Sequence, residues 1–294
     1  MKKFLIIVLA MLLCVGCCFG STACSCGGKK TIGYQTGTTG GMYINGDEDW
    51  GFDGFPNIEG KGYKTAALAA TDLINGNLYA VVVDDMPAKA IVNSMNKGGK
   101  KLKVIDIELT SEQYAFGFAK GSPMVADFNA FFDMLKTTGY DGETFDGIMA
   151  KYFQGEGTKK GYAYETVSSG FGNAGNSNQL VIATNIPFSP FEYEDNGKMY
   201  GVDIEIAALY AKYKGLELVI KNMDFDSVLL AVQQGYADMG CAGLTVNPSR
   251  LATNDFSTEY YNASQKLIVA YDNTDFDDCK TAADVEAILK SLNK

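Results

Sequence analysis

The sequence predicts an α/β protein made of two similarly built lobes. Short apolar stretches typical of buried strands alternate along the chain with stretches that have the periodicity of amphipathic helices. Residues 73–81 (LINGNLYAV) and residues 232–239 (VQQGYADM) repeat the same order of helix end, glycine stop and strand. Any βαβ unit can produce this echo, but it supports two lobes of similar build. The 294 residues, 47% hydrophobic and 20% charged, can bury one large core or two ordinary ones.

The composition excludes several classes of function. The formal net charge is −10, so nucleic acid is not an expected partner. Histidine is absent, which excludes Ser-His and Cys-His nucleophile pairs and every imidazole metal site. Cys241 and Cys279 are the two cysteines of the body, and no C-x-x-C pair there indicates zinc or a thioredoxin-like motif. We expect no metal and no cofactor, and we expect these two thiols to be unpaired, with a disulfide as the alternative that export permits.

The N-terminus has the features of a secretory leader. Lys2 and Lys3 precede a near-continuous apolar stretch from Phe4 to Val15. We therefore expect an exported protein and assign residues 1–24 to a lipoprotein-type signal peptide.

Cysteines that follow small residues at the end of this leader resemble a lipobox. Cys17 and Cys24 are the candidates for lipidation; each lacks the usual leucine three residues earlier, and we prefer Cys17. Such an anchor would hold the protein at the outer face of the cytoplasmic membrane, or the protein would be periplasmic. An uncleaved helical anchor running to about Gly20 is the weaker alternative, because the apolar stretch barely reaches the ~17 residues that a span requires.

Periodicity and turn residues predict the order of elements in the first half of the chain. The expected strands are 31–35, 79–83 and 102–107, and the expected helices are 64–75, 86–96, 122–138 and 144–153. Residues 47–62, rich in glycine, aspartate and aromatic residues, are expected to form a loop.

The second half begins after a stretch without apolar periodicity. Residues 155–179 are dominated by Gly, Ser, Asn and Tyr, which predicts a flexible surface linker. The expected strands that follow are 180–184, 216–220, 237–241 and 266–271, and the expected helices are 204–213, 225–234 and 281–292.

Three places at strand ends carry residues suited to binding a charged ligand. The glycines and threonines of 36–41 can present backbone N–H groups and hydroxyls to an anion, although the stretch lacks the lysine of a phosphate loop. Asp84 follows a buried strand, where it can meet an ammonium group; a solvated aspartate is the alternative. Arg250, the only arginine of the sequence, has a planar fork that suits a carboxylate, with a surface arginine as the alternative.

These residues lie in segments that resemble a known family. The stretches 184–191 (TNIPFSPF), 201–203 (GVD), 224–226 (DFD) and the T-x-x-x-x-R element from Thr245 to Arg250 resemble lobe 1 of the polar amino-acid solute-binding proteins of ABC transporters, solute-binding protein family 3. The strand at 31–35 followed by QTGTTG resembles the start of their lobe 2. The resemblance covers nearly the whole body. It implies a two-lobe type 2 periplasmic-binding-protein-like fold with two crossing strands, an amino-acid ligand and a membrane permease as partner.

The resemblance also implies a role for each matching residue. Arg250 and Thr39 would hold the ligand carboxylate with Thr245 alongside, and Asp84 and the Gly243 carbonyl would hold the ammonium group. The ligand-binding set it implies is Arg250, Thr245, Gly243, Thr39, Thr38, Asp84, Phe188, Phe225, Asn185 and Gln35. The two phenylalanines match aromatic positions that sandwich the ligand side chain. Asn185 stands where members that bind basic amino acids carry an acid, which favours a neutral or polar ligand, with cystine among the candidates.

The order of the two lobes differs from that of the family. Lobe 2 comes first, which resembles a circular permutation. The expected lobe 2 is 30–114 plus 275–294, and the expected lobe 1 is 118–155 plus 179–271. Residues 156–178 are expected to join the family's usual termini. Residues 108–120 and 266–271 are the expected crossing segments. A linker of ~25 residues reaches roughly 25–30 Å, enough to close most gaps on one domain. A fragment of a tandem array, or an engineered chain, is the alternative.

Two other classes of function stay open on the same fold. An enzyme, such as a cyclic-acid dehydratase or a muramidase-like module, is one, and Glu112 is then the cleft-side acid of interest. The extracellular sensor domain of a signalling protein is the other, and we disfavour it because no second span or cytoplasmic domain follows. The match of the whole zwitterion-binding set and the absence of histidine favour a binding protein without enzymatic activity. We expect this protein to be a monomer.

Overall fold

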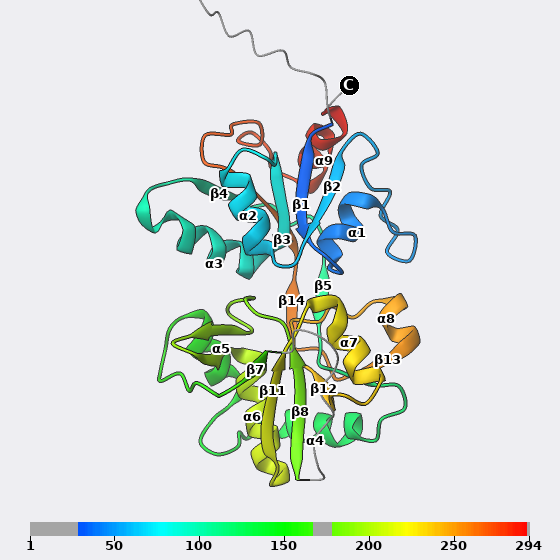
Figure 1. Ribbon diagram of the computed structural model, residues 1–294, viewed down its shortest axis with the longest axis vertical. Helices are drawn as coiled ribbons and strands as arrows, with labels where there is room; N and C mark the ends of the chain where they lie inside the picture. The colour runs from blue at the N-terminus through cyan, green and yellow to red at the C-terminus, as the bar shows by residue number, and fades with distance from the viewer. Residues whose placement is uncertain (1–28, 167–177, 293–294) are drawn as a thin grey trace, which may run out of the picture.

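The computed structural model describes residues 29–166 and 178–292. The leader, both lipidation candidates (Cys17 and Cys24) and residues 167–177 of the expected linker lie outside these ranges. Two lobes, each built around its own β-sheet, lie above and below a narrow connection (Figure 1). We call the lobe that contains the N-terminal strand lobe 2 and the other lobe 1. No helix in the described ranges is long and apolar enough to cross a membrane.

Lobe 2 is a five-stranded sheet with helices on both faces. The strand order is β2-β1-β3-β15-β4; β1 runs parallel to β2 and β3, and β15 runs antiparallel to β3 and β4. The strands are β1 (Thr31–Gln35), β2 (Glu59–Tyr63), β3 (Ala80–Asp84), β4 (Leu102–Ile105) and β15 (Gln265–Ala270). The helices are α1 (Thr39–Asn45), α2 (Ala66–Ile74), α3 (Asp85–Met95), the 3₁₀ turn η1 (Asn96–Gly98) and α9 (Ala282–Ser291).

The apolar sequence of the central strands explains this layering. Residues of β3 and β15 alternate between two cores, with Val81 and Ile268 packed on the side of α2 and α3, and Val82 and Leu267 on the side of α1 and α9. A sheet covered on both faces requires continuous apolar strands, and AVVV in β3 and LIV in β15 meet that requirement.

Lobe 1 is a six-stranded sheet with the order β13-β6-β12-β8-β11-β7. Its strands are β6 (Gly117–Ala119), β7 (Glu165–Thr166), β8 (Gln179–Thr184), β11 (Glu217–Asn222), β12 (Met239–Gly240) and β13 (Asn254–Phe256), with a hairpin of β9 (Tyr193–Asp195) and β10 (Lys198–Tyr200) beside them. Its helices are α4 (Met124–Thr137), α5 (Phe145–Phe153), α6 (Val202–Lys214), α7 (Phe225–Gln233) and α8 (Pro248–Thr253). Aromatic rings fill much of its core, where Phe116 stacks on Tyr260 with ring centroids 4.9 Å apart.

The two lobes are joined by a pair of short antiparallel strands, β5 (Glu112–Tyr114) and β14 (Tyr261–Ala263) (Figure 1). The prediction that 266–271 is a crossing strand and part of lobe 1 is wrong, because β15 lies between β3 and β4 inside the lobe 2 sheet. Its consecutive buried apolar residues suit a central strand, whereas β14, with the exposed Asn262, runs between the lobes.

Two further expectations are corrected by the sheets. The expected loop 47–62 ends in the edge strand β2, whose sequence EGKGY has no apolar alternation and takes its strand conformation from pairing with β1. The expected linker contains β7, which pairs with β11, and Tyr162 forms a bridge with Met199. The other expected helices and strands are present, with ends shifted by at most two residues.

Both ends of the described chain contribute to lobe 2. Ile32 of β1 shares a core with Val285 and Leu289 of α9. The Asn57 side chain donates hydrogen bonds to the carbonyls of Leu289 and Leu292, at 2.8 and 2.6 Å. Cys241 and Cys279 are both free thiols, the first buried in the core of lobe 1 and the second partly exposed against that of lobe 2.

Candidate ligand-binding site

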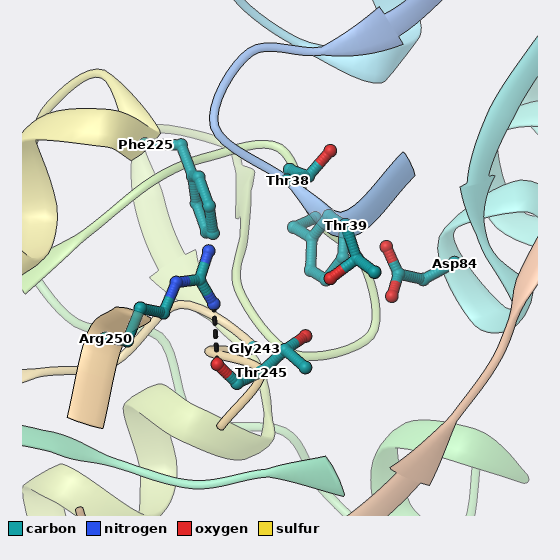
Figure 2. Close-up of a pocket in the computed structure, with 8 residues that line it drawn as sticks. Thr38, Thr39, Asp84, Phe225, Gly243, Thr245 and Arg250 are labelled. Atoms are coloured by element: carbon teal, nitrogen blue, oxygen red, sulfur yellow. Dashed lines mark hydrogen bonds between the residues drawn. The ribbon is translucent and has the colours of Figure 1, made fainter. Parts of the chain in front are cut away.

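A pocket, which we call the cavity, lies between the lobes and is lined by residues from both. Lobe 2 contributes Thr38, Thr39 and Asp84; lobe 1 contributes Phe188, Phe225, Gly243, Thr245 and Arg250. These are eight of the ten residues that the sequence selected as a binding set. Figure 2 shows Arg250 on one side, Asp84 on the other, and Thr39 between them.

The two threonines of lobe 2 are placed by the turn that follows β1. Gly37 has a φ of +80°, which a glycine adopts at little cost and which reverses the chain before α1. The Thr38 hydroxyl donates to the Gln35 carbonyl at 2.7 Å. The Thr39 hydroxyl is buried and, among the described residues, has no hydrogen-bond partner. A buried polar atom without a partner is costly, so this hydroxyl is suited to bind a polar group in the cavity.

Arg250, the only arginine of the sequence, is held at the start of α8. Asn247 caps this helix by accepting the Arg250 backbone N–H at 2.7 Å. The guanidinium donates to the Thr245 carbonyl at 2.7 Å and, across the cleft, to the Gly37 carbonyl at 3.0 Å. Its Cζ lies 5.4 Å from the centre of the Phe225 ring, within cation–π range. Burial lowers the pKa of Arg250 to about 10, so the side chain stays a cation at neutral pH.

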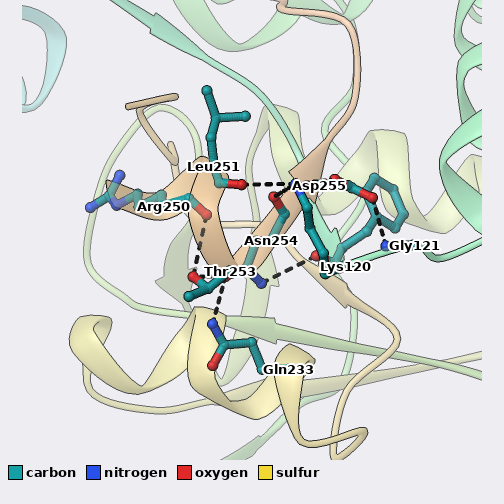
Figure 3. A network of polar contacts seen from close by, with 9 residues as sticks. Lys120, Gly121, Gln233, Arg250, Leu251, Thr253, Asn254 and Asp255 are labelled. Carbon is teal, nitrogen blue, oxygen red and sulfur yellow. Dashed lines mark hydrogen bonds and ion pairs between the residues drawn. The ribbon is translucent and has the colours of Figure 1, made fainter. Parts of the chain in front are cut away.

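A polar network fixes α8 from behind (Figure 3). Asn254, fully buried, donates to the Phe118 carbonyl at 3.1 Å and accepts from Gln233 at 3.0 Å. Lys120 donates to the Leu251 carbonyl at 2.8 Å and pairs with Asp255 at 2.8 Å. The helix that carries the guanidinium is therefore tied to β6, to α7 and to its own following strand, which orients Arg250 toward the cavity.

Asp84 is the buried acid on the opposite side. It ends β3, is 4% exposed, and accepts a hydrogen bond from the Tyr114 hydroxyl at 2.6 Å. Burial, followed by the nearby charge of Glu112, raises the pKa of Asp84 to about 8. A cationic group in the cavity would stabilise the ionised carboxylate against both effects.

Gly243 is held in an unusual conformation by an acid beneath it. Its φ is +51°, and a Cβ there would lie 2.7 Å from the Phe188 ring, so the position requires glycine. The Gly243 N–H donates to the buried Asp203 carboxyl at 3.0 Å, and the Tyr260 hydroxyl donates to the same group at 2.6 Å. Burial raises the pKa of Asp203 to about 7.

Gln35 and Asn185 do not line the cavity. They bond to each other across the lobes, with Gln35 Nε2 donating to Asn185 Oδ1 at 2.7 Å, and Asn185 also donates to the Met223 carbonyl at 2.6 Å. Lys64 and Asp224 form a second, exposed bridge between the lobes at 3.1 Å. The two predicted residues therefore hold the cleft walls together.

Sequence reasoning did not select the residues that support the site from behind. Tyr114, Gln265 and Tyr260 carried no motif, and Asp203 was noted only as part of a matching stretch. The one available signal was that Asp203 follows a glycine at the start of a helix. This signal does not show that Asp203 binds Gly243, which lies 40 positions away. Within the described ranges, no group of three Cys, Asp or Glu side chains is placed to hold a metal ion.

Comparison with known proteins gives a partial match. The family described as bacterial extracellular solute-binding proteins, family 3, matches residues 180–294. The chain is 32% identical over 106 residues to the arginine-binding extracellular protein ArtP of Bacillus subtilis, covering 36% of this chain and 42% of ArtP. It is 37% identical over 78 residues to the arginine-binding protein ArgT of Corynebacterium glutamicum, covering 26% of each. The chain thus spans less than half the length of these curated relatives.

Two other kinds of match complete the comparison. The membrane-bound lytic murein transglycosylase F of Alcanivorax borkumensis is 33% identical over 91 residues, which cover 31% of this chain and 19% of the enzyme. Among solved structures, holo ArgBP from T. maritima aligns with a TM-score of 0.42 and 13% identity, covering 91% of each chain.

The buried acid beneath Gly243 predicts a pH dependence of stability. Because its folded pKa is raised from 3.8 to about 7, Asp203 keeps a proton in the folded state that the unfolded chain has lost, so stability falls as pH rises between these values. Urea unfolding of the ligand-free protein at pH 4.5 to 7 should show a steeper fall for wild type than for Asp203→Asn, by up to about 1.4 kcal/mol per pH unit. Parallel curves for the two proteins would contradict this assignment. Asp84 and Glu192, whose pKa values burial also raises, titrate in both proteins.

Proposed function

We propose that this chain is an exported amino-acid-binding protein that serves an ABC importer, because residues 180–294 match the family described as bacterial extracellular solute-binding proteins, family 3. The observation that carries the proposal is the charge arrangement of the cavity. A guanidinium from lobe 1 and a carboxyl from lobe 2 lie at its two sides, and an amino-acid zwitterion presents the complementary charges. The fold is the two-lobe α/β fold of such binding proteins.

The carboxylate of the ligand would bind beside Arg250 and the two threonines of the β1–α1 turn. Arg250 already donates one bond to the Gly37 carbonyl of that turn, which shows that its fork reaches lobe 2. The Thr39 hydroxyl, buried and without a partner among the described residues, would donate to the second carboxylate oxygen. The resulting pair of charge-assisted bonds would join the two lobes through the ligand.

The ammonium group would bind at the other side of the cavity, on Asp84 and the Gly243 carbonyl. Phe188 and Phe225 would enclose the ligand side chain and exclude water, which strengthens the charged bonds. Two relatives are named for arginine, whereas Asn185 of this chain is neutral and bonded to Gln35 and to the Met223 carbonyl.

Export, anchoring and partners complete the proposal. The leader would direct the chain out of the cytoplasm, and lipidation at Cys17, or at Cys24, would hold it on the outer face of the membrane beside the permease. Closure of the lobes around the ligand would present a monomeric complex to that permease. The match to the murein transglycosylase covers only 19% of that enzyme, so we propose binding and not catalysis.

We also propose that the chain is a circular permutation of the family's usual order. The family match begins at residue 180, directly after the expected linker, and runs to the end of the chain. The first described strand, β1, and the last helix, α9, share one core. The expected linker includes β7, which belongs to the lobe 1 sheet. In that sheet β11 separates β7 from β8, the strand at which the family match begins. A segment that joins the family's usual termini would be expected to start and end in lobe 1 in this way.

A thermal-shift screen of the twenty amino acids plus L-cystine tests the binding function. At least one should raise the melting temperature strongly, because a ligand far above its Kd stabilises the folded state by ~3–4 kcal/mol. Cyclic carboxylic acids and a muropeptide serve as comparison compounds. Stabilisation by these compounds alone, without any amino acid, would favour the enzyme alternative.

The charge arrangement predicts the effect of two substitutions. Arg250→Ala and Asp84→Asn should each weaken binding of the best amino acid of that screen by ~30-fold or more, because removing one partner of a desolvated charge pair costs ~2–5 kcal/mol. Titration calorimetry measures the affinities, and Lys290→Ala, which removes an exposed cation on α9, is the control. An affinity like that of wild type in either variant would remove that residue from the site.

The permutation is tested by restoring the usual order. A reordered chain, with residues 179–294 followed directly by residues 30–154, should fold and show the same profile in the amino-acid screen, since Lys294 and Lys30 would be the two sides of one break. The control reorders the chain at a break inside β8, between Ile182 and Ala183, and should not fold. Aggregation of the first chain would count against the permutation and leave the binding proposal untouched.

A further inference from the structure

Glu112 is a buried acid whose side chain contacts both lobes without lining the cavity. It lies on the crossing strand β5 and is 2% exposed. Its carboxylate accepts from Thr110 at 2.7 Å, from Gln265 Nε2 at 3.0 Å and from the Thr245 hydroxyl at 2.9 Å. Gln265 belongs to lobe 2 and Thr245 to lobe 1. All three donors are uncharged, so they satisfy the oxygens without neutralising the charge.

The hydrogen bond to Glu112 determines which hydrogen bond the Thr245 hydroxyl can form with a ligand. A hydroxyl has one proton, and the Thr245 hydroxyl donates it to Glu112 Oε2. Thr245 also lines the cavity. Because its proton is donated to Glu112, the hydroxyl oxygen can only accept a hydrogen bond there. It can therefore accept a hydrogen bond from an ammonium group, but it has no proton left for the ligand carboxylate.

Glu112 also influences the acid that faces the cavity. In the register of β3 and β15, Gln265 stands directly opposite Asp84, and the same Gln265 side chain reaches Glu112. The charge of Glu112 is one of the causes that raise the pKa of Asp84. The charges of both acids also act on Arg250, where they oppose the lowering of its pKa by burial.

We infer that Glu112 is a positioning residue for the ammonium group of the ligand, because it orients the Thr245 hydroxyl as an acceptor and adds negative charge beside Asp84. The inference rests on the proposed amino-acid-binding function and adds to it a residue that the ligand does not touch. It moves Thr245 from the carboxylate side of the ligand to the ammonium side.

A double-mutant cycle tests this role. The proteins are wild type, Glu112→Gln, Thr245→Val and the double variant, each titrated with the amino acid that most stabilises wild type in the panel of twenty plus L-cystine. Each single variant should weaken binding about 10-fold, in line with the loss of one hydrogen bond to a charged group. The double variant should be weakened little more than Thr245→Val alone, because Glu112 acts through that hydroxyl.

Two further variants separate positioning from a structural role. Thr245→Ser keeps the hydroxyl and should restore most of the affinity, and Glu286→Gln on α9 changes an acid remote from the cavity and should leave binding unchanged. Ligand-free melting temperatures, measured beside each titration, show whether a variant is folded. A merely structural Glu112 would lower those temperatures without coupling to Thr245 in binding.

The outcomes distinguish the two proposals. If no amino acid of the panel stabilises wild type, the proposed function fails and this inference fails with it. If wild type binds and Glu112→Gln binds equally well, or if the loss in the double variant equals the product of the two single losses, only the role of Glu112 is overturned.

Discussion

The cost of burying charge governs the region between the lobes. Arg250, Asp84 and Glu112 are held in or beside one cavity, and their side chains form hydrogen bonds to neutral groups of the protein. A charge removed from water is stable only when a complementary charge or several strong donors replace the lost solvent. This cost raises the pKa of Asp84 on one side of the cavity and lowers the pKa of Arg250 on the other. The zwitterion that we propose as ligand would compensate both, so that binding and lobe closure would be one event.

Besides the bonds of Arg250 and Glu112 across the cleft, the lobes are joined by weaker contacts. Lys64 and Asp224 form an ion pair whose side chains are 73% and 55% exposed, and pairs of this kind contribute ~0–1 kcal/mol. Gln35 and Asn185 add one neutral hydrogen bond. The crossing strands β5 and β14 fix the lobes only at their junction. In the binding cycle that we propose, a ligand in the cavity would add charged bonds between the lobes to these contacts.

The residues that line the cavity could be predicted from the sequence, whereas the residues that support them from behind could not, and the reason is physical. Thr39, Asp84 and Thr245 all lie where a strand ends and a helix or loop begins, and in an open α/β sheet such ends meet at one edge. Strand ends can be recognised from local patterns. Glu112 and Asp203, in contrast, act on residues 133 and 40 positions away, and only the packed lobes show that Thr245 and Gly243 are their partners.

The same limit explains which elements of the fold were missed. Apolar alternation identified the central strands, but β2 and β7 at the sheet edges contain glycine and polar residues and depend on their neighbours for their conformation. For β15, the strand itself was predicted within one residue, and only its place was wrong. An apolar strand that follows a crossing segment can join either sheet, and local sequence does not distinguish the two.

The position of β15 has a consequence for how lobe 2 is built. It lies between β3 and β4, so the lobe 2 sheet is continuous only when residues 265–270 have joined strands that precede them by about 160 positions or more. Lobe 1 takes all its described strands from one uninterrupted part of the chain, between β6 and β13. Contacts that are distant in sequence form more slowly because loop closure must precede them. Lobe 1 can therefore assemble as a unit, whereas lobe 2, which supplies Thr39 and Asp84 to the cavity, requires both ends of the chain.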